Sequence, residues 1–224
     1  MKYFDYPQGS PEWRSLRRGR LTMSKLHIVM TGTIRAKNKL LSELGNEFFA
    51  EPEINSSAVQ WGRMHEAQAL ANYRISVQDG SSCGPCGFFL HPSLPVGGSP
   101  DGIVLKGDTV VSGVEIKCPF NPAIHAGYLH GGAEALPASY IWQVRGALWL
   151  IRSALHWDFV TFDPRPDRFE DRFGFLRFYR EESSDLLITE KVTEFCDHLI
   201  GNTFYPEASV STLIASGVVP KFFT

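Results

Sequence analysis

Two neighbouring runs with the alternating pattern of β-strands constrain this chain more than any other feature. The first run, GIVLK, occupies residues 102–106, and the second, VVSGVEIKC, occupies residues 110–118, with turn-forming residues between them. Because successive side chains of a strand point to opposite faces, Glu115 and Lys117 share one face, while the valine and isoleucine beside them face the other way. The pattern predicts a β-hairpin whose second strand carries an acid and a lysine side by side.

Asp101, directly before the first strand, brings a second acid to the same edge of the hairpin. Two carboxylates held close together repel each other unless a cation lies between them, and oxygen ligands favour Mg²⁺ or Mn²⁺ over Zn²⁺. Lys117 cannot bind a metal while it is charged, so we expect it to orient a water molecule or to neutralise charge on a phosphoryl group. On these residues alone, a salt-bridged pair on an exposed strand edge is the alternative.

Helical and strand patterns surround the hairpin. Caps and apolar spacing predict helices over residues 11–18, 22–30, 34–49, 55–76, 121–132, 137–153 and 183–202, the second of them capped by Thr22. Further strands are predicted over residues 87–92, 154–164 and 172–181. Together these elements predict an α/β fold with a central mixed sheet flanked by helices, in no more than three layers.

Length and composition favour one domain and argue against several classes of protein. The chain has 224 residues, 43% of them hydrophobic, which suits a single domain over residues 1–224. No apolar run approaches the roughly 20 residues of a membrane-spanning helix, so no membrane contact is expected. The N-terminus lacks the pattern of a secretion signal, and four scattered cysteines do not form the disulfide framework of a small secreted domain. We therefore expect an intracellular protein.

Charge is distributed unevenly along the chain. The formal net charge is -2, yet residues 1–39 contain nine basic and two acidic side chains, a local charge of +7 that leaves -9 for the rest. A basic segment beside an acidic body can attract a polyanion locally even though the overall charge is low. A solvated surface without a partner is the alternative interpretation of this segment.

The charged residues of the hairpin lie in SPDG (99–102) and EIK (115–117), which fit the PD-(D/E)xK signature of nucleases. With their surroundings, GGSPDG and VEIKCPF, these segments resemble the phage lambda exonuclease family, the viral alkaline recombinases grouped with YqaJ-type proteins. Four further segments, in the same order, are similar to motifs of that family: EWRSLRRGRLTMS (12–24), WGRMHE (61–66), SYIWQVRGALWL (139–150) and FDPR (162–165). The resemblance covers about residues 10 to 180.

The resemblance implies a restriction-endonuclease-like core and assigns catalytic roles by position. Asp101, Glu115 and the backbone carbonyl of Ile116 would bind Mg²⁺, for which Mn²⁺ is expected to substitute. Lys117 would position or activate the attacking water. Glu66 would complete a second metal position, directly or through water, so that the site holds two ions.

Other residues are assigned by the resemblance to the DNA end. Four of them match positions that hold the terminal 5′-phosphate in this family: Arg17, Ser24, Ser99 and Gln143. A guanidinium, two hydroxyls and an amide suit that anion. Trp13 lies close to these residues in sequence, and one interpretation is that it stacks on a base or wedges the duplex end open; the alternative is a core or interface residue. The helical segment over residues 10–50 would thus contribute to DNA-end binding, whereas residues 204–224 have no counterpart and no assigned role.

The activity implied by the resemblance is Mg²⁺-dependent digestion of one strand of linear double-stranded DNA from its 5′ end. The product would be a 3′ single-stranded overhang for a single-strand annealing protein in phage-type recombination. Family members form homotrimeric rings, and the resemblance implies a phage- or prophage-encoded protein in the cytoplasm of a bacterial host. Two alternatives stay open: a PD-(D/E)xK endonuclease of restriction or repair type, and a non-catalytic scaffold that binds DNA ends.

The cysteines and histidines offer weaker alternatives. CGPC over residues 83–86 reproduces the thioredoxin motif, but that chemistry needs the first cysteine at a helix N-terminus, and a strand-like run follows here. An iron–sulfur cluster like that of some RecB-type nucleases would need a different cysteine spacing. The seven histidines show no zinc-ligand spacing. We expect neither redox nor zinc chemistry.

Overall fold

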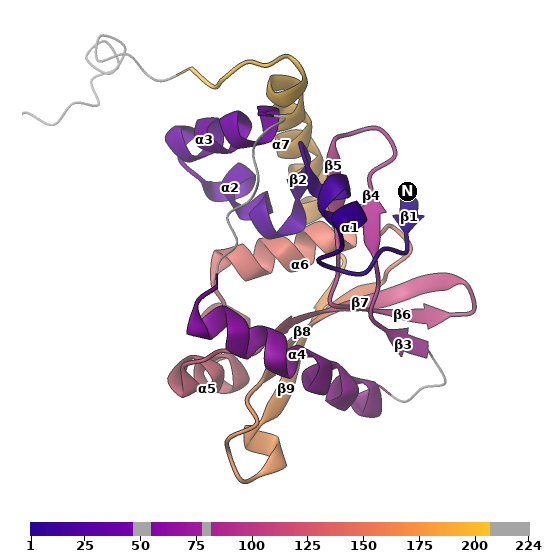
Figure 1. The fold of residues 1–224 in the computed structure, drawn as a ribbon, viewed down its shortest axis with the longest axis vertical. Coiled ribbons are helices and arrows are strands. Elements are labelled where there is room, and N and C mark those ends of the chain that lie inside the picture. The colour runs from indigo at the N-terminus through magenta and orange to yellow at the C-terminus, as the bar shows by residue number, and fades with distance from the viewer. Residues whose placement is uncertain (47–54, 78–81, 207–224) are drawn as a thin grey trace, which may run out of the picture.

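A five-stranded mixed sheet lies at the centre of the fold (Figure 1). The computed structural model describes residues 1–46, 55–77 and 82–206. In spatial order the strands are β3 (Ser82–Gly84), β6 (Gly102–Lys106), β7 (Thr109–Lys117), β8 (His156–Phe162) and β9 (Phe173–Tyr179). β7 and β8 are parallel, and the other neighbours are antiparallel. The predicted α/β fold with a central mixed sheet is confirmed.

The predicted hairpin is formed by β6 and β7, which a two-residue turn at Gly107 and Asp108 connects. Gly107 has a φ of +60°, a conformation that glycine adopts without steric cost. The strands pair Gly102 with Val114, and continuing this register places Asp101 opposite Glu115. Opposite positions of an antiparallel pair bring their side chains together, so the hairpin itself juxtaposes the two acids.

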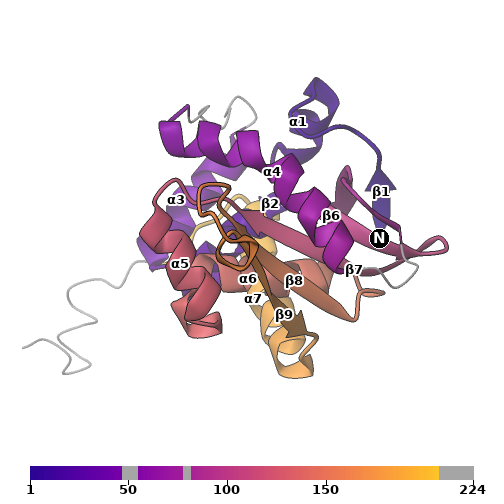
Figure 2. The same cartoon turned by 90° about the horizontal axis from the view of Figure 1, so that it is seen from below.

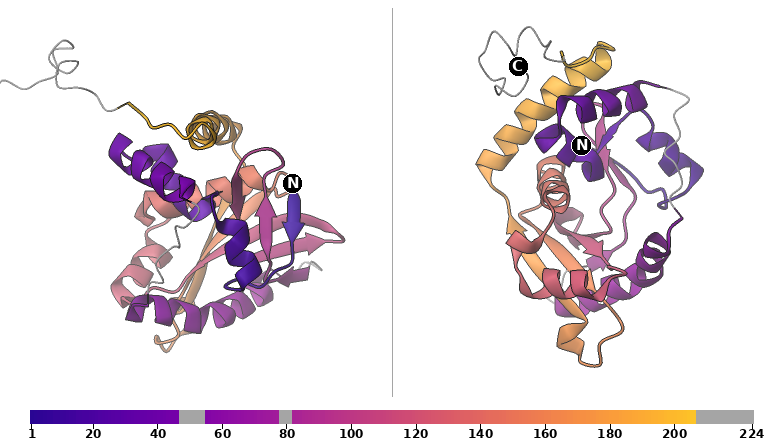
Figure 3. Two further views of the ribbon diagram at one scale, coloured as in Figure 1. Left: turned by 45° about the horizontal axis from the view of Figure 1, so that its top comes forward. Right: turned by 90° about the vertical axis from the view of Figure 1, so that its left-hand side faces the viewer.

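Helices cover both faces of this sheet. α4 (Ser57–Ser76) packs on one face, where it buries Tyr73 and its neighbours against apolar residues of β6, β7 and β8 (Figure 2). α6 (Ala138–Leu150) packs on the opposite face, with α5 (Pro122–His130) beside it against β8 and β9 (Figure 3). The acids of the hairpin therefore lie at an edge that is flanked by helices on both sides.

A further helical layer lies behind α6, so the prediction of three layers at most is wrong. It consists of α2 (Leu26–Thr31), α3 (Ile34–Gly45) and α7 (Glu182–Ile200) (Figure 1). The reason lies in α6 itself, which is buried continuously from Gly146 to Leu150. A helix that is apolar all round needs cover on its second side as well as on the sheet side.

Four short strands form a second sheet, of which the sequence patterns predict only the run over residues 87–92. In spatial order they are β1 (Lys2–Phe4), β4 (Phe88–Leu90), β5 (Val96–Gly98) and β2 (Leu21–Thr22) (Figure 3). β2 runs parallel to β5, with Leu21 opposite Val96 and Thr22 opposite Gly97. This pairing attaches the N-terminal segment to the chain just before Asp101.

The short helix predicted through Met30 with Thr22 as its cap is present, as a 3₁₀ turn over Met23–Lys25 that leads into α2, which ends at Thr31. Thr22 lies in β2 and occupies the cap position, but its side chain forms no cap hydrogen bond, and its hydroxyl lies 3.1 Å from that of Ser24. By contrast, α1 (Pro11–Arg17) begins as predicted, with the Ser10 side chain accepting a hydrogen bond from the backbone of Trp13. The end of the helix predicted over residues 34–49 and nearly all of the 204–224 segment lie outside the described residues.

The CGPC segment does not have the structure of a redox motif. Cys83 lies in β3 and not at the first turn of a helix, and the buried thiol of Cys86 donates a 3.3 Å hydrogen bond to the carbonyl of Pro100. Burial raises the pKa of both thiols above the usual range, which lowers their reactivity. Within the described ranges, no helix is both long and apolar enough to cross a membrane.

Candidate functional site

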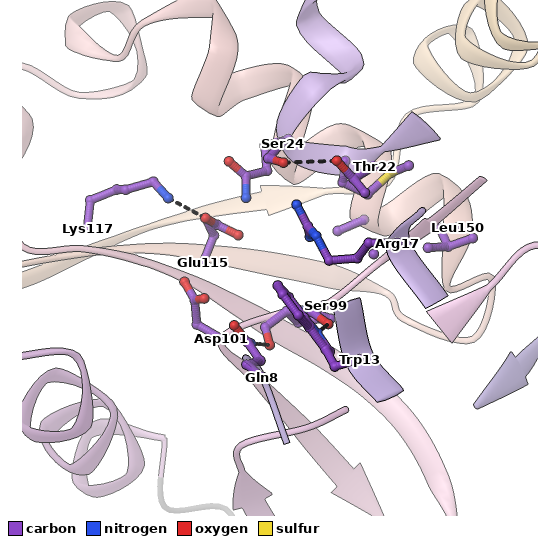
Figure 4. A pocket seen from close by; sticks show the side chains of 15 residues that line it. Gln8, Trp13, Arg17, Thr22, Ser24, Ser99, Asp101, Glu115, Lys117 and Leu150 are labelled. Atoms are coloured by element: carbon purple, nitrogen blue, oxygen red, sulfur yellow. Dashed lines mark hydrogen bonds and ion pairs between the residues drawn. The ribbon is translucent and has the colours of Figure 1, made fainter. Parts of the chain in front are cut away.

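One pocket, with a volume of about 190 Å³, brings together most of the predicted site residues (Figure 4). Its walls come from the N-terminal segment, the chain between β5 and β6, the end of β7, and α6. The predicted residues that line it are Trp13, Arg17, Ser24, Ser99, Asp101, Glu115, Lys117 and Gln143. Two of the three proposed metal acids, Asp101 and Glu115, therefore face the same space as the proposed phosphate ligands, whereas Glu66 does not line this pocket.

The hairpin fixes the charged wall of the pocket. Glu115 is 3% exposed and accepts a 2.5 Å hydrogen bond from Nζ of Lys117, so the two side chains point the same way, as predicted (Figure 4). Oδ2 of Asp101 accepts a 2.7 Å hydrogen bond from the backbone N–H of Ile116. The two acids and the lysine thus form one connected group at the end of β7.

Burial raises the pKa of all three acids at this site, and repulsion by Asp101 adds to the effect on the two glutamates. Burial, and after it the neighbouring Asp101, raises the pKa of Glu115 to about 8, and Lys117 only partly opposes this. The same two causes raise the pKa of Glu66, on α4, to about 7, and burial also raises that of Asp101. Burial of Lys117 favours its neutral form, but Glu115 and Asp101 outweigh it and raise its pKa. When ionised, the three carboxylates carry more negative charge than one ammonium neutralises.

The residues present fit a divalent cation that is only partly coordinated by protein. Across the described residues, no three His, Cys, Asp or Glu side chains converge closely enough to hold a metal ion. Asp101 and Glu115 supply two carboxylates, and a third oxygen is available from Ile116, because the N–H and C=O of a strand residue point to the same side. Mg²⁺ commonly takes one or two carboxylates and keeps water or phosphate as its other ligands. Glu66 fits a role through water.

The opposite wall of the pocket is held by an aromatic residue. The indole N–H of Trp13 donates to Oγ of Ser99 at 2.6 Å, and that hydroxyl donates in turn to the carbonyl of Gly87 at 2.8 Å. The guanidinium carbon of Arg17 lies 4.5 Å from the centre of the Trp13 ring. Trp13 therefore orients both Arg17 and Ser99, and Arg17 covers one face of its ring.

Two glycines allow the 3₁₀ turn that carries Ser24 to approach α6. A Cβ added at Gly146 of α6 would lie 2.7 Å from Sδ of Met23, and one added at Gly98 would lie 2.9 Å from Cγ of Met23. Because positions three apart lie on the same face of a helix, Gln143 is on the same side of α6 as Gly146. The missing side chains thus let Ser24 and Gln143 line the same pocket.

Three residues at the site escaped the sequence analysis. Gln8 donates from Nε2 to the carbonyl of Pro100 at 3.1 Å, and the Thr22 hydroxyl lies 3.1 Å from that of Ser24. Nζ of Lys117 lies 5.0 Å from the centre of the Tyr140 ring, a cation–π contact. Thr22 and Tyr140 lie in two of the segments that resemble family motifs, residues 12–24 and 139–150, so the resemblance could have pointed to them. No sequence pattern pointed to Gln8.

Comparison with known proteins agrees with the predicted family. Residues 12–152 match the YqaJ-like viral recombinase domain. No curated protein sequence matches the chain. Among solved structures, an alkaline exonuclease (LHK-Exo) from Laribacter hongkongensis is similar, with a TM-score of 0.72 and 25% identity over 93% of this chain and 98% of that chain.

Two further structures support the same fold. LHK-Exo in complex with dAMP has a TM-score of 0.72 and 28% identity over 86% of this chain and 94% of that chain. A phage-related exonuclease from Haemophilus somnus 129PT has a TM-score of 0.63 and 15% identity over 82% of this chain and 96% of that chain, a likeness of fold alone. The predicted resemblance and restriction-endonuclease-like core are confirmed.

Proposed function

We propose, because this chain belongs to the YqaJ-like viral recombinase domain family, that it is a Mg²⁺-dependent exonuclease acting on linear double-stranded DNA. It would digest one strand from the 5′ end and leave a 3′ single-stranded overhang. The observation that carries the proposal is the shared pocket, in which Asp101, Glu115 and Lys117 face Trp13 and Arg17. A cation site next to an anion site suits an enzyme that holds a strand terminus while it cuts nearby.

The similar structures support a nuclease reaction. LHK-Exo is an alkaline exonuclease, and one of its structures contains dAMP, a deoxynucleotide. The acids and lysine of this chain occupy the end of a central strand, which is where ligands bind in sheets with parallel neighbours. The first observation favours phosphodiester hydrolysis over simple DNA-end binding, and the second places the acids where a ligand can reach them.

Asp101 and Glu115 would hold Mg²⁺, with the carbonyl of Ile116 as a further ligand and with Glu66 acting through water in a two-ion site. Mn²⁺ is expected to substitute, because it accepts the same oxygen ligands. Bound there, the cation would lower the pKa of a coordinated water and neutralise charge on the phosphoryl oxygens.

Lys117 acts in this proposal as a hydrogen-bond donor and not as a base. The carboxylates beside it overcome the effect of burial and raise its pKa, which keeps the ammonium protonated at neutral pH. It can therefore donate to the attacking water or to a phosphoryl oxygen as negative charge develops. Water adds to phosphorus, the bond from phosphorus to O3′ breaks, and O3′ gains a proton.

The opposite wall would hold the 5′-phosphate of the strand being digested. The donors available there are the Arg17 guanidinium, the Ser24 hydroxyl and the Gln143 amide, with Ser99 positioned by Trp13. Hydrolysis between the first two nucleotides releases a mononucleotide and leaves a new 5′-phosphate on the shortened strand. Each cut would thus recreate the group that this wall binds.

The proposals for origin, partner and oligomeric state rest on the family and on the net charge. The viral recombinase family favours a phage- or prophage-encoded enzyme in the bacterial cytoplasm that hands its overhang to a single-strand annealing protein. A net charge of -2 gives little general attraction for DNA, so a homotrimeric ring would retain the duplex by enclosing it. Light scattering on the purified protein should give three times the mass of one chain.

The deciding experiment compares linear duplexes bearing 5′-phosphate or 5′-hydroxyl ends with covalently closed circles, in Mg²⁺ or EDTA. Mononucleotides should come from linear DNA only, faster from phosphorylated ends, and should be lost with EDTA or in Asp101→Ala. Cleavage of the circles would replace the proposal with an endonuclease. Binding of ends without cleavage in Mg²⁺ or Mn²⁺ would replace it with a scaffold.

A further inference from the structure

An aromatic cluster beside the ends of β7 and β8 has no part in the reaction described above. It consists of Trp61 on α4, Phe120 shortly after β7, and Arg165 in the turn after β8. The guanidinium carbon of Arg165 lies 4.5 Å from the centre of the Trp61 ring. The Phe120 ring meets Trp61 edge-on, with ring centres 5.8 Å apart. Three segments that are distant in sequence thus converge on one small surface.

The position of the cluster follows from the parallel pairing of β7 and β8. Lys117, at the end of β7, is paired with Thr161 of β8, so both strands finish at the same edge of the sheet. Phe120 and Arg165 each follow within a few residues of that edge. Ligands of sheets with parallel strands bind outside these carboxyl ends, which places the cluster directly beside the catalytic group.

Asp163 fixes the orientation of Arg165. Nε and Nη2 of Arg165 donate to the two carboxylate oxygens of Asp163, at 2.7 Å each, and the backbone N–H of Arg165 donates to the same carboxylate at 3.0 Å. Asp163 is fully buried, whereas the Arg165 side chain is 38% exposed. The pair carries no net charge, so it presents a flat guanidinium plane and not an attractive field for phosphate.

The cluster and the phosphate wall lie on opposite sides of the acids. Ser24 and Gln143 lie on the side of α6, which packs on one face of the sheet. Trp61 belongs to α4, which packs on the opposite face, and Phe120 lies against it. A strand with its 5′-phosphate at Arg17 and its scissile phosphate at the acids therefore continues toward Phe120.

We infer that Trp61, Phe120 and Arg165 form a second contact site for the substrate strand, for the nucleotide on the 3′ side of the scissile phosphate. Its base would stack on the Phe120 ring, which is 50% exposed, while the guanidinium of Arg165 holds the Trp61 ring against which Phe120 packs. The inference rests on the proposed function, which sets the direction of the strand. Stacking accepts any base, as an enzyme that digests a strand without regard to sequence requires.

The test is a thermodynamic cycle between protein and DNA, measured as binding in EDTA so that no strand is cut. The probe is a 3′-labelled duplex of about twenty base pairs with a 5′-phosphate, either intact or with an abasic residue as the second nucleotide. Phe120→Ala and the abasic residue should each weaken binding by about tenfold. Combined, they should weaken it no more than either does alone, because both remove the same contact.

Matched variants separate stacking from general damage. Phe169→Ala removes another exposed phenylalanine near the same edge and should leave the affinity unchanged. Arg165→Lys keeps the charge but loses the plane, so it should weaken binding, whereas Arg168→Ala in the same turn should not. Additive effects of Phe120→Ala and the abasic residue, or equal effects of Phe169→Ala, would overturn the second contact site.

The outcome is independent of whether the proposed reaction is correct. Digestion of linear DNA by the unmodified protein in Mg²⁺ tests the reaction by itself. If the protein digests linear DNA but the effects of Phe120→Ala and the abasic residue are additive, only the second contact site is refuted. If the effects are not additive but no digestion occurs, only the reaction is refuted, and the site remains a DNA contact.

Discussion

The indole nitrogen of Trp13 and the hydroxyl of Ser99 are joined by a 2.6 Å hydrogen bond across 86 positions of sequence. This bond connects α1 to the segment that leads into Asp101, and the same indole supports Arg17 on its face. The phosphate wall of the pocket is therefore ordered by contacts within the protein. A wall ordered in advance binds its ligand with a smaller entropic cost.

Trp13→Phe should weaken discrimination between 5′-phosphate and 5′-hydroxyl ends. The substitution keeps an aromatic ring for Arg17 but removes the donor to Ser99. A hydrogen bond of this kind contributes about 0.5–1.5 kcal/mol, so the preference for phosphorylated duplexes should fall roughly 2- to 10-fold. Rates on matched duplexes measure this, and Trp157→Phe, which lies in the core, serves as the control. An unchanged preference would show that Trp13 does not organise the wall.

Lys117→Met should reduce the rate of the chemical step by about 100-fold or more. The change removes the donor that stabilises developing negative charge but keeps much of the side chain's length. Single-turnover digestion at saturating enzyme measures the step separately from binding. Lys106→Met, at the exposed end of β6 in the same hairpin, should digest DNA normally. Equal losses in the two variants would point to damage of the hairpin and not of the chemistry.

Stability of the metal-free protein should fall as pH rises through the neutral range. Glu66 and Glu115 have pKa values raised by burial and by Asp101 to about 7 and about 8, against ordinary values of 4.5. Between the ordinary pKa of 4.5 and the raised values, the folded state binds more protons than the unfolded state, so the free energy of unfolding decreases with rising pH. Below the ordinary values that difference vanishes, and the full contribution to stability is present.

Mg²⁺ should restore this stability at high pH, because binding requires the ionised carboxylates. Thermal unfolding at pH values from about 5 to about 9, with EDTA or Mg²⁺, measures both effects. Glu115→Gln should flatten the decline and abolish most of the stabilisation by Mg²⁺. A melting temperature that rises equally with Mg²⁺ at the acid and alkaline ends would contradict the assignment of these acids as ligands.

Arg180→Met should lower the free energy of unfolding by about 3 kcal/mol. The guanidinium of Arg180 donates to the carbonyls of Leu148, Ile151 and Ala154 at 2.6–3.0 Å, where α6 ends. It also donates to Asp185 of α7, at 2.7 Å. The variant would leave the three carbonyls without this donor, while Asp185 would keep its hydrogen bond from Arg152.

Urea unfolding measures this loss of stability, and a second arginine provides the control. Arg152 also donates to Asp185, but its side chain is 69% exposed. Arg152→Met should therefore cost less than about 1 kcal/mol, as exposed ion pairs usually do. Similar losses for the two variants would show that the hydrogen bonds from Arg180 to the end of α6 add little stability.

The parts of the site carried by one hairpin could be predicted from the sequence. Alternation along β7 places Glu115 and Lys117 on one face, and this relation is local, so the pattern contains it. The register that brings Asp101 opposite Glu115 also needs the shift between Val104 and Leu105, which the pattern does not predict. The resemblance to a known family added the phosphate residues, which no local pattern would have connected.

What the sequence did not reveal depends on distant partners. β2 has two residues and becomes a strand only because β5, over seventy positions away, supplies its hydrogen bonds. Thr22 is one of these two residues and pairs with Gly97. Gln8 reaches Pro100 across 92 positions. Short elements with long-range partners have no periodicity to detect, and the second sheet consists of such elements.

The pairing of β2 with β5 has a consequence for the length of the product. The two strands run side by side in the same direction, and both lead out of the ladder into the pocket, β2 toward Ser24 and β5 toward Ser99 and then Asp101. In the proposed enzyme, main-chain hydrogen bonds therefore set the spacing between the held terminus and the bond that breaks. Because the backbone fixes this spacing, every cut would remove one nucleotide.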